Sequence, residues 1–309
     1  MSGSEKELDN LLASLEAAGV LPTFMQSAVR LLESAEEAAS LRRAEEAGEI
    51  IWRRYLEMTG SSRFLQALPD REHRYRWAQT CIRAILLSRY TLEAILQDRV
   101  RKHPERFLFR ETAGETGSGW TYAQSALRLR AIAGMFCAVE SEPRVAILSE
   151  NSVESACCDL ACLVHRIFDT PLSVHFDATT LSWIFDRLAI NIAVADTEER
   201  IQRLCEVRSK TARPFRIFQL GVPGAEGHAA GGVESLDGAC ARFDLERSGA
   251  LLAPRKNRPL ADVATVMFTS GSTGAPKGIA FTLYHLVAKR FARAAALPGV
   301  GNDEVLAVI

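Results

Sequence analysis

From residue 144 onward, short apolar segments alternate with amphipathic ones, and this alternation leaves few folds open to the chain. The apolar segments predict buried strands at 144–148, 191–195, 215–220 and 264–268. The amphipathic segments predict helices at 153–168, 181–188 and 201–209. Continuous apolar strands separated by helices form parallel sheets with helices on both faces. We therefore expect an α/β fold with a parallel-rich sheet layered with helices.

Shorter elements flank this alternation. They are expected, in chain order, as a strand at 107–109, a helix from about 120 to 139, a glycine-rich loop at 221–232 and a short helix near 235–247. A basic connector bounded by Pro254 and Pro259 then leads to the last predicted strand of the sheet.

The first part of the chain shows only helical periodicity. Leu8, Leu11 and Leu15 fall on one helical stripe, and later Leu and Ile positions recur among dense Glu and Arg. No long-period repeat is present, so a helical solenoid is not favoured. We expect an all-helical amino-terminal extension at 1–88 and the α/β domain at 89–309. The extension either packs on that domain or docks a protein partner or a membrane surface.

Composition excludes several classes of partner. The chain has 37 Lys and Arg residues against 38 Asp and Glu residues, a formal net charge of −1, so we expect no nucleic-acid partner. No apolar run approaches the roughly 20 residues of a membrane span, so we expect no transmembrane segment. The acidic start has no export signal, and the scattered cysteines suit reduced thiols. A cytoplasmic location is expected.

One cluster contains residue types that often bind metals. Cys158, Cys162 and His165 share one face of a predicted helix, but no fourth ligand and no Cys-x-x-Cys pair accompany them. Free cysteine is among the most buried residue types. We therefore expect core packing at these positions and no metal site.

The strand at 264–268 runs into a loop with the composition of a phosphate-binding segment. Gly271 and Gly274 let the backbone turn tightly and direct its amides to one point. Hydroxyl groups surround these glycines, on Thr269, Ser270, Ser272 and Thr273. Pro276 stiffens the loop, and Lys277 adds a positive charge. Convergent donors together with one cation suit a phosphate chain.

The spacing of this loop departs from the nucleotide P-loop, which reads Gly-x-x-x-x-Gly-Lys-Ser/Thr and opens into a helix. Here Lys277 is followed by Gly278, and residues 279–281 predict a strand. A kinase or GTPase is therefore disfavoured. We expect the loop to join two strands at the mouth of a sheet.

Residues 268–278, FTSGSTGAPKG, resemble the phosphate-binding signature of the adenylate-forming (AMP-binding) enzymes, which include acyl-CoA synthetases, peptide synthetase adenylation domains and luciferases. Trp120-Thr121-Tyr122-Ala123 and the segment 144–152 resemble two earlier landmarks of that family, in the same order. The resemblance covers about residues 100–309.

This resemblance implies an ATP-dependent acid:thiol ligase of the acyl-CoA synthetase type. A carboxylate oxygen would attack the α-phosphorus of ATP and expel pyrophosphate, and the thiol of coenzyme A would then take the acyl group. Residues 279–298 are most similar to bacterial long-chain fatty acyl-CoA synthetases, which favours a fatty acid. The length of that acid stays open, as do an aromatic acid and an amino acid, because the family's acyl-pocket residues lie mostly after this segment. The resemblance assigns the β- and γ-phosphates to Thr269, Ser270, Gly271, Ser272, Thr273, Gly274 and Lys277. Pro276 and Gly278 would shape the loop.

Other working parts of the family follow this loop in its members and are not found before residue 309. We therefore expect the catalytic residues and the Mg²⁺ ligands beyond residue 309, an incomplete synthetase domain at 89–309, and no adenylation by the 309-residue chain alone. The segment His165-Arg166-Ile167 also differs from the family pattern, in which small residues usually occupy these positions. Two alternatives stay open: an adenylation domain that loads a carrier protein, and a truncated, non-catalytic module that binds ATP or a protein.

Overall fold

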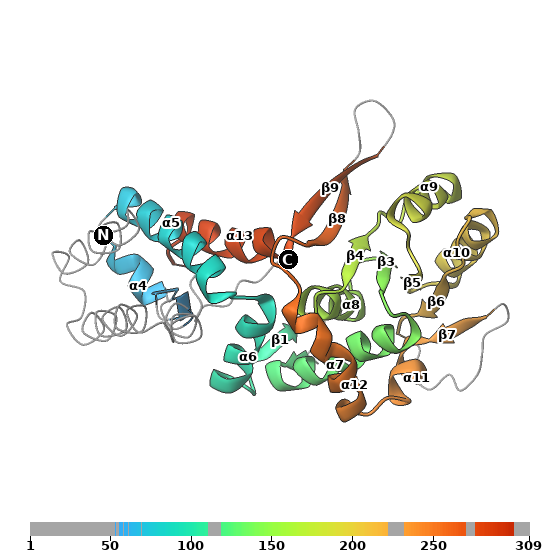
Figure 1. Ribbon diagram of the computed structural model, residues 1–309, viewed down its shortest axis with the longest axis horizontal. Helices are drawn as coiled ribbons and strands as arrows, with labels where there is room; N and C mark the ends of the chain where they lie inside the picture. The colour runs from blue at the N-terminus through green and yellow to red at the C-terminus, as the bar shows by residue number, and fades with distance from the viewer. Residues whose placement is uncertain are drawn as a thin grey trace. The chain divides into compact units, whose positions relative to one another are not determined.

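The computed structural model describes residues 53, 56–57, 59–60, 62–68, 70–110, 119–221, 232–269 and 276–299 (Figure 1). Two compact units divide them: the described residues up to Thr91 with those from Tyr284 onward, and Leu92–Leu283. Most of the expected amino-terminal extension, residues 222–231 of the loop predicted at 221–232, and residues 300–309 lie outside the described residues. The predicted domain boundary at residue 88 stays a prediction.

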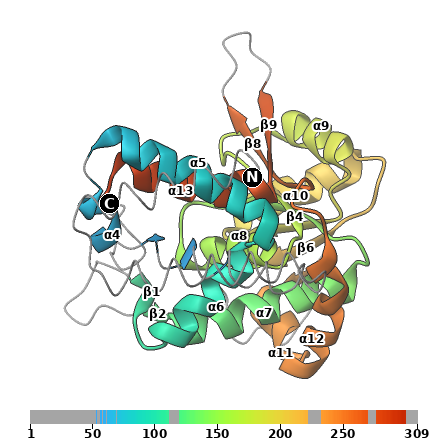
Figure 2. The same ribbon diagram turned by 60° about the vertical axis from the view of Figure 1, so that its left-hand side comes forward.

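Among its described residues, the first unit contains helices. They are α4 (Ser62–Ala67), α5 (Arg71–Ser88) and most of α13 (Leu283–Ala296). Helices α5 and α13 lie side by side in both views (Figures 1 and 2). The buried Trp77 of α5 packs with its ring centroid 6.0 Å from that of Phe291 on α13. Arg74 Nε also donates a hydrogen bond to the carbonyl oxygen of Ala295 at 3.2 Å. These contacts join α5 and α13, two helices that are far apart in the sequence.

The second unit is built around a seven-stranded sheet in the order β7-β6-β5-β3-β4-β8-β9. Its strands are β3 (Arg144–Leu148), β4 (Phe168–Pro171), β5 (Ile192–Ala195), β6 (Arg216–Gln219), β7 (Val233–Ser235), β8 (Val263–Thr269) and β9 (Lys277–Thr282). Neighbouring strands are parallel, except that β8 and β9 are antiparallel. A second, antiparallel pair consists of β1 (Phe107–Arg110) and β2 (Gly119–Thr121). The predicted parallel-rich α/β fold is confirmed.

Helices cover both faces of the large sheet. They are α6 (Leu92–Lys102), α7 (Tyr122–Val139), α8 (Val153–Val164), α9 (Ala178–Leu188), α10 (Glu198–Lys210), α11 (Leu236–Ala241), α12 (Leu245–Leu252) and the 3-10 helix η1 (Ala253–Asn257). Val145 and Ile147 of the central strand β3 pack into the core formed with α7, α8 and α12. Ala146 and Leu148 pack into the core formed with α9 and α10. Because alternate side chains of a strand enter different cores, its sequence is apolar throughout.

Local capping signals determine where several of these helices begin. In each case an N-cap side chain accepts a hydrogen bond from the backbone N–H three residues later. The caps are Thr121, Ser152, Asp177, Thr197, Ser235 and Asp244. Thr121 and Ser152 complete capping boxes with Gln124 and Ser155.

The helix predicted at 153–168 is wrong in its last part. Helix α8 ends at Val164, and Phe168 begins strand β4. Arg166 adopts a left-handed conformation with φ of 58°, and the N–H of Ile167 donates to the carbonyl of Cys162 at 2.8 Å. This is a Schellman termination, in which glycine is the usual residue at the left-handed position.

The single helix expected near 235–247 is also wrong. The segment holds the end of β7 and then two helices, because Ser235 caps α11 and Asp244 caps α12. The basic connector that follows begins inside η1.

Two arginines join the end of α8 to this connector. Arg166 Nη1 donates to the carbonyl oxygens of Arg255, Lys256 and Arg258, the first and last at 3.3 and 3.1 Å. Arg255, only 6% exposed, donates back to the carbonyls of His165 and Arg166 at 3.3 and 2.7 Å. This reciprocal contact offsets the cost of a non-glycine residue in the left-handed region.

A pair of carboxyl groups is buried under the same strands. Asp169 of β4 is fully buried beside Asp159 of α8, and Thr265 of β8 is its register partner. Burial raises the pKa of Asp169 well above its usual range, and the neighbouring Asp159 carboxyl raises it further. Burial likewise raises the pKa of Asp159. The pair is therefore held with a proton in the folded protein.

Replacing Asp169 by Asn should change how stability depends on pH. The folded chain keeps a proton that the unfolded chain loses above about pH 4, so the wild-type free energy of unfolding should fall as pH rises. The Asp169→Asn substitution removes the part of this loss that Asp169 causes and leaves the part that comes from Asp159, so the variant should be more stable by roughly 1 to 3 kcal/mol at about pH 8. Urea unfolding across this pH range is the measurement, with Glu206→Gln as an exposed control. Parallel pH profiles for wild type and Asp169→Asn would contradict the prediction.

Two substitutions of Arg166 distinguish the cost of its left-handed backbone from the loss of its side-chain hydrogen bonds. Arg166→Ala and Arg166→Gly both remove the guanidinium and should both lower the free energy of unfolding. The Gly variant should be the more stable of the two by about 1 kcal/mol, because glycine adopts a positive φ without strain. Urea denaturation of both variants tests this. An Ala variant as stable as the Gly variant would show that the left-handed position carries no strain.

Candidate functional site

Strands β8 and β9 form a hairpin. The segment that joins them, residues 270–276, is the glycine-rich loop that the sequence predicts to bind phosphate. Their ladder runs from the pair Val263 and Thr282 to the pair Thr269 and Lys277 (Figures 1 and 2). Thr269 Oγ1 also donates to the carbonyl oxygen of Lys277 at 3.5 Å. The predicted strand on each side of the loop is confirmed, and a strand rather than a helix contains Gly278. The geometry is therefore not that of a P-loop.

The structure describes only part of the predicted phosphate-binding set. Thr269, Pro276, Lys277 and Gly278 are described, and the pairing of Thr269 with Lys277 places the two ends of the loop opposite each other. Both side chains are exposed. The remaining predicted residues lie outside the described residues: Ser270, Gly271, Ser272, Thr273 and Gly274. Their assignment to phosphates stays a prediction.

The hairpin enters the sheet next to β4. Asp169 and Thr265 are partners in the parallel ladder, and Thr170 Oγ1 donates to the carbonyl of Val266 at 2.7 Å. The helices that follow β3 and β4 lie on opposite faces, so a topological switch point lies between these two strands. Open α/β sheets bind ligands at the carboxyl ends of strands at such a point. Thr269, at the carboxyl end of β8, leaves the sheet at that same edge.

Aromatic side chains support the hairpin beneath the loop. Phe268 packs edge-on against Phe176 and Trp183, with ring centroids 6.3 and 6.5 Å apart. Edge-to-face pairs at such distances are favourable. The sequence pattern does not mark Phe176 or Trp183, because their contact with Phe268 joins different parts of the chain. An aromatic residue directly before the loop is the only local signal.

Gly278 lies directly opposite Phe268 in the ladder. A Cβ atom at this position would lie 3.0 Å from Val266 Cγ1 and 3.1 Å from Phe268 Cε1. Because Val266 is buried and Phe268 is held by two other rings, neither neighbour can move freely. A glycine therefore fits closely at the base of the loop.

A polar network ties the turns at the carboxyl ends of β3 and β5. Arg200 Nη1 donates to both oxygens of Asp196 at 2.6 and 2.7 Å, and its Nη2 lies 3.1 Å from Glu150 Oε1. The N–H of Glu150 also donates to Asp196 at 3.2 Å. Desolvation acts to raise the pKa of Asp196, but the hydrogen bonds from Arg200 and Ser149 outweigh it and lower the pKa. The network keeps this edge of the sheet ordered and charged.

Cys158 and Cys162 are fully buried free thiols, and burial raises the pKa of each. His165 is the C-cap residue of helix α8. Burial and, to a smaller extent, the positive charge of Arg130 lower its pKa to about 4. In the ranges that the structure describes, no three His, Cys, Asp or Glu side chains gather as metal ligands would. Nor does any described helix have the length and apolar character needed to cross a membrane.

The parallel sheet thus carries, one strand from its switch point, a hairpin whose loop sequence is rich in glycine and hydroxyl residues. The family model of the AMP-binding enzymes matches residues 96–309, and the chain belongs to this family of adenylate-forming enzymes. The family uses ATP generally.

Known relatives are distant. Long-chain-fatty-acid CoA ligase FadD15 of Mycobacterium bovis is 25% identical over 196 residues, which cover 63% of this chain and 31% of that protein. FadD15 of Mycobacterium tuberculosis has the same identity and coverage. The chain therefore spans about a third of the length of these curated relatives. A solved structure described as a long-chain-fatty-acid CoA ligase from Rhodopseudomonas palustris shares the fold, with a TM-score of 0.53 and 17% identity over 67% of this chain and 48% of that one.

Replacing Gly278 by Ala should weaken the hairpin. The added methyl group presses on Val266 and Phe268, and we expect a loss of about 1 kcal/mol in the free energy of unfolding. The double variant Phe268→Leu, Gly278→Ala should lose less than the sum of the two single variants, because the smaller side chain makes room. Urea unfolding of the four proteins in this cycle gives the coupling. Additive losses would show that the ring does not restrict position 278.

Proposed function

We propose that this chain forms part of an ATP-dependent acid:thiol ligase that activates a fatty acid and transfers it to coenzyme A. The observation that carries the proposal is the closure of the glycine- and hydroxyl-rich loop by the Thr269–Lys277 pair at the carboxyl edge of the sheet. A loop whose sequence offers glycine amides, hydroxyls and one ammonium group at such a position suits the polyphosphate of ATP.

In the proposed reaction a carboxylate oxygen attacks the α-phosphorus of ATP, the bond to the bridging oxygen breaks, and pyrophosphate leaves. A thiol then attacks the acyl carbon of the adenylate and AMP leaves. Negative charge builds on the departing phosphates during the first step, and fixed donors that meet this charge lower the barrier. We assign this task to Lys277 together with the hydroxyls and amides of residues 269–274.

The exposed Lys277 side chain stands at the end of β9, and its backbone is held in the ladder. Its Cα is therefore fixed in the ladder, and its exposed side chain can turn towards a bound phosphate. Thr269, opposite it, offers a hydroxyl from the other strand. Pro276 and Gly278 shape the loop, the latter through its close fit against Phe268.

The substrate and the acceptor are proposed from the similarity to FadD15. FadD15, to which 63% of the chain is similar, is a long-chain-fatty-acid CoA ligase, and this favours a fatty acid and coenzyme A. We further propose that Mg²⁺ accompanies ATP and is held by ligands outside the described residues. Residues 1–88 precede the family match, and we propose that they form a helical extension, of which helix α5 packs against α13.

Lys277→Ala should weaken the use of ATP because a charge-assisted contact with phosphate is lost. A contact of this kind contributes roughly 1.5 to 3 kcal/mol, so we expect kcat/KM for ATP to fall about 10- to 150-fold. The measurement is fatty-acid-dependent exchange of pyrophosphate into ATP, made on the protein translated from the complete reading frame that contains residues 1–309.

Lys210→Ala is the matched control, because it removes an exposed lysine from helix α10 and should leave the exchange rate unchanged. An equal rate for Lys277→Ala and wild type would remove this lysine from the site. Exchange driven by amino acids and not by fatty acids would contradict the proposed substrate and favour a carrier-loading domain.

A further inference from the structure

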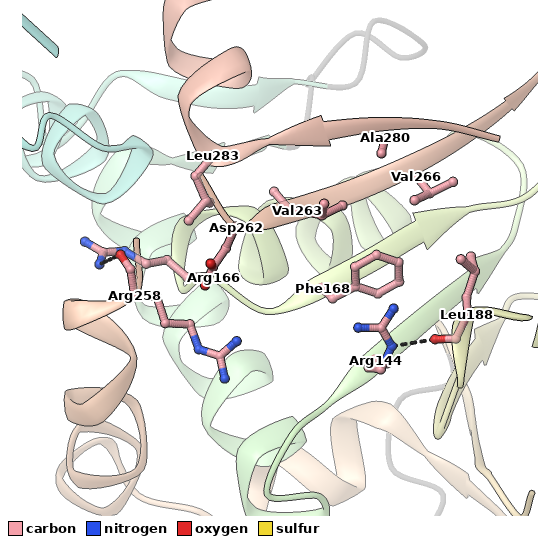
Figure 3. A pocket seen from close by; sticks show the side chains of 11 residues that line it. Arg144, Arg166, Phe168, Leu188, Arg258, Asp262, Val263, Val266, Ala280 and Leu283 are labelled. Atoms are coloured by element: carbon pink, nitrogen blue, oxygen red, sulfur yellow. Dashed lines mark hydrogen bonds between the residues drawn. The ribbon is translucent and has the colours of Figure 1, made fainter. Parts of the chain in front are cut away.

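A pocket of about 460 Å³ lies at the amino ends of β3, β4 and β8 (Figure 3). Arg144 begins β3, Phe168 begins β4 and Val263 begins β8, and all three line the pocket. Thr269 ends β8 about 20 Å beyond Val263 and about 10 Å beyond Val266, the lining residue of β8 that is nearest to the glycine-rich loop. The volume is in the usual range for small-molecule sites.

Arg144 is the cation that defines one wall. Its guanidinium carbon lies 3.8 Å from the centroid of the Phe168 ring, and its Nε donates to the carbonyl oxygen of Leu188 at 2.5 Å (Figure 3). These contacts use one face of the guanidinium and one N–H. They hold the group in a fixed orientation and leave both terminal nitrogens for another partner.

No carboxylate among the described residues forms an ion pair with Arg144. Glu142 is near enough to act on it electrostatically, but its carboxylate pairs with Arg258 and lies 3.7 Å from Arg255. Desolvation lowers the pKa of the Arg144 guanidinium, which shows that burial of this charge is not fully compensated. An anion placed against the terminal nitrogens would supply the missing partner.

The other charged groups of the lining leave the pocket positive. Arg166 and Arg258 also line it, against the single carboxylate of Asp262. Arg166 donates to three backbone carbonyls of the basic connector. Arg166 belongs to the segment that differs from the family pattern, and Arg258 belongs to the basic connector. The proposed ligase function uses neither segment, and both contribute a side chain to this pocket.

Most of the remaining wall is apolar. Leu188 of α9, Val263 and Val266 of β8 and Leu283 of α13 provide it (Figure 3). A ligand that fits must therefore combine one anionic group with an apolar body. A guanidinium binds a planar carboxylate through two parallel N–H groups, and the apolar wall favours an anion with an apolar body over inorganic phosphate.

We propose that this pocket binds a small organic carboxylate, with its carboxylate against the terminal nitrogens of Arg144 and its apolar body along Leu188, Val263 and Leu283. The site is independent of the proposed ligase reaction, because it needs neither ATP nor the glycine-rich loop.

Titration of the chain with octanoate, without ATP, tests the proposal by calorimetry and by methyl NMR. Octanoate should bind and should shift the methyl resonances of Leu188 and Val263. Octanol, which lacks the charge, and inorganic phosphate, which lacks the apolar body, should each bind at least about 10-fold more weakly.

Arg144→Met should weaken octanoate binding at least about 10-fold, and Arg144→Lys should weaken it less. Arg187→Gln, which removes one exposed charge from α9 outside the pocket lining, should bind octanoate as the wild type does. Equal binding of octanol and octanoate, or shifts confined to methyl groups away from the pocket, would overturn the proposal. The NMR result on the wild type decides the matter even if an Arg144 variant does not fold. Failure here leaves the pyrophosphate exchange untouched, so the two proposals can fail separately.

Discussion

The position of the glycine-rich loop depends on the parallel pairing of β8 with β4. The two strands are far apart in sequence, yet Asp169 pairs with Thr265 in the ladder and the Thr170 hydroxyl donates to the carbonyl of Val266. This pairing places the carboxyl end of β8 beside the switch point of the sheet, and β9 then returns Lys277 to a position opposite Thr269. Without it, the same loop residues would be a flexible segment with no neighbouring binding edge.

The sheet can accept β8 because its central strands are covered on both faces. Alternate residues of β3 enter two cores, one with α7, α8 and α12 and the other with α9 and α10. Right-handed crossovers in opposite directions from β3 and β4 put their helices on opposite faces, and this creates the switch point. The aromatic contacts of Phe268 with Phe176 and Trp183 then hold the hairpin to the α9 side.

Charged groups divide between the two edges of this sheet. The carboxyl edge carries Lys277 and the paired Asp196 and Arg200, while the amino edge carries Arg144, whose terminal nitrogens have no acidic partner among the described residues. Arg166 illustrates a local cost that distant contacts offset. Its left-handed backbone conformation is strained for a residue with a side chain, and the hydrogen bonds from its guanidinium to carbonyls of the basic connector offset that strain.

The sequence by itself determined the α/β class, most strand positions and the strand, loop and strand order around the glycines, because apolar runs, N-caps and glycine spacing act over a few residues. It did not determine the end of α8, since the left-handed Arg166 is stabilised by carbonyls that are distant in sequence. Nor did it mark Phe176, Trp183 or the buried pair of Asp159 and Asp169. Only the tertiary structure decided which strand receives β8 and which arginines share a pocket, because strand order depends on contacts that no local pattern encodes.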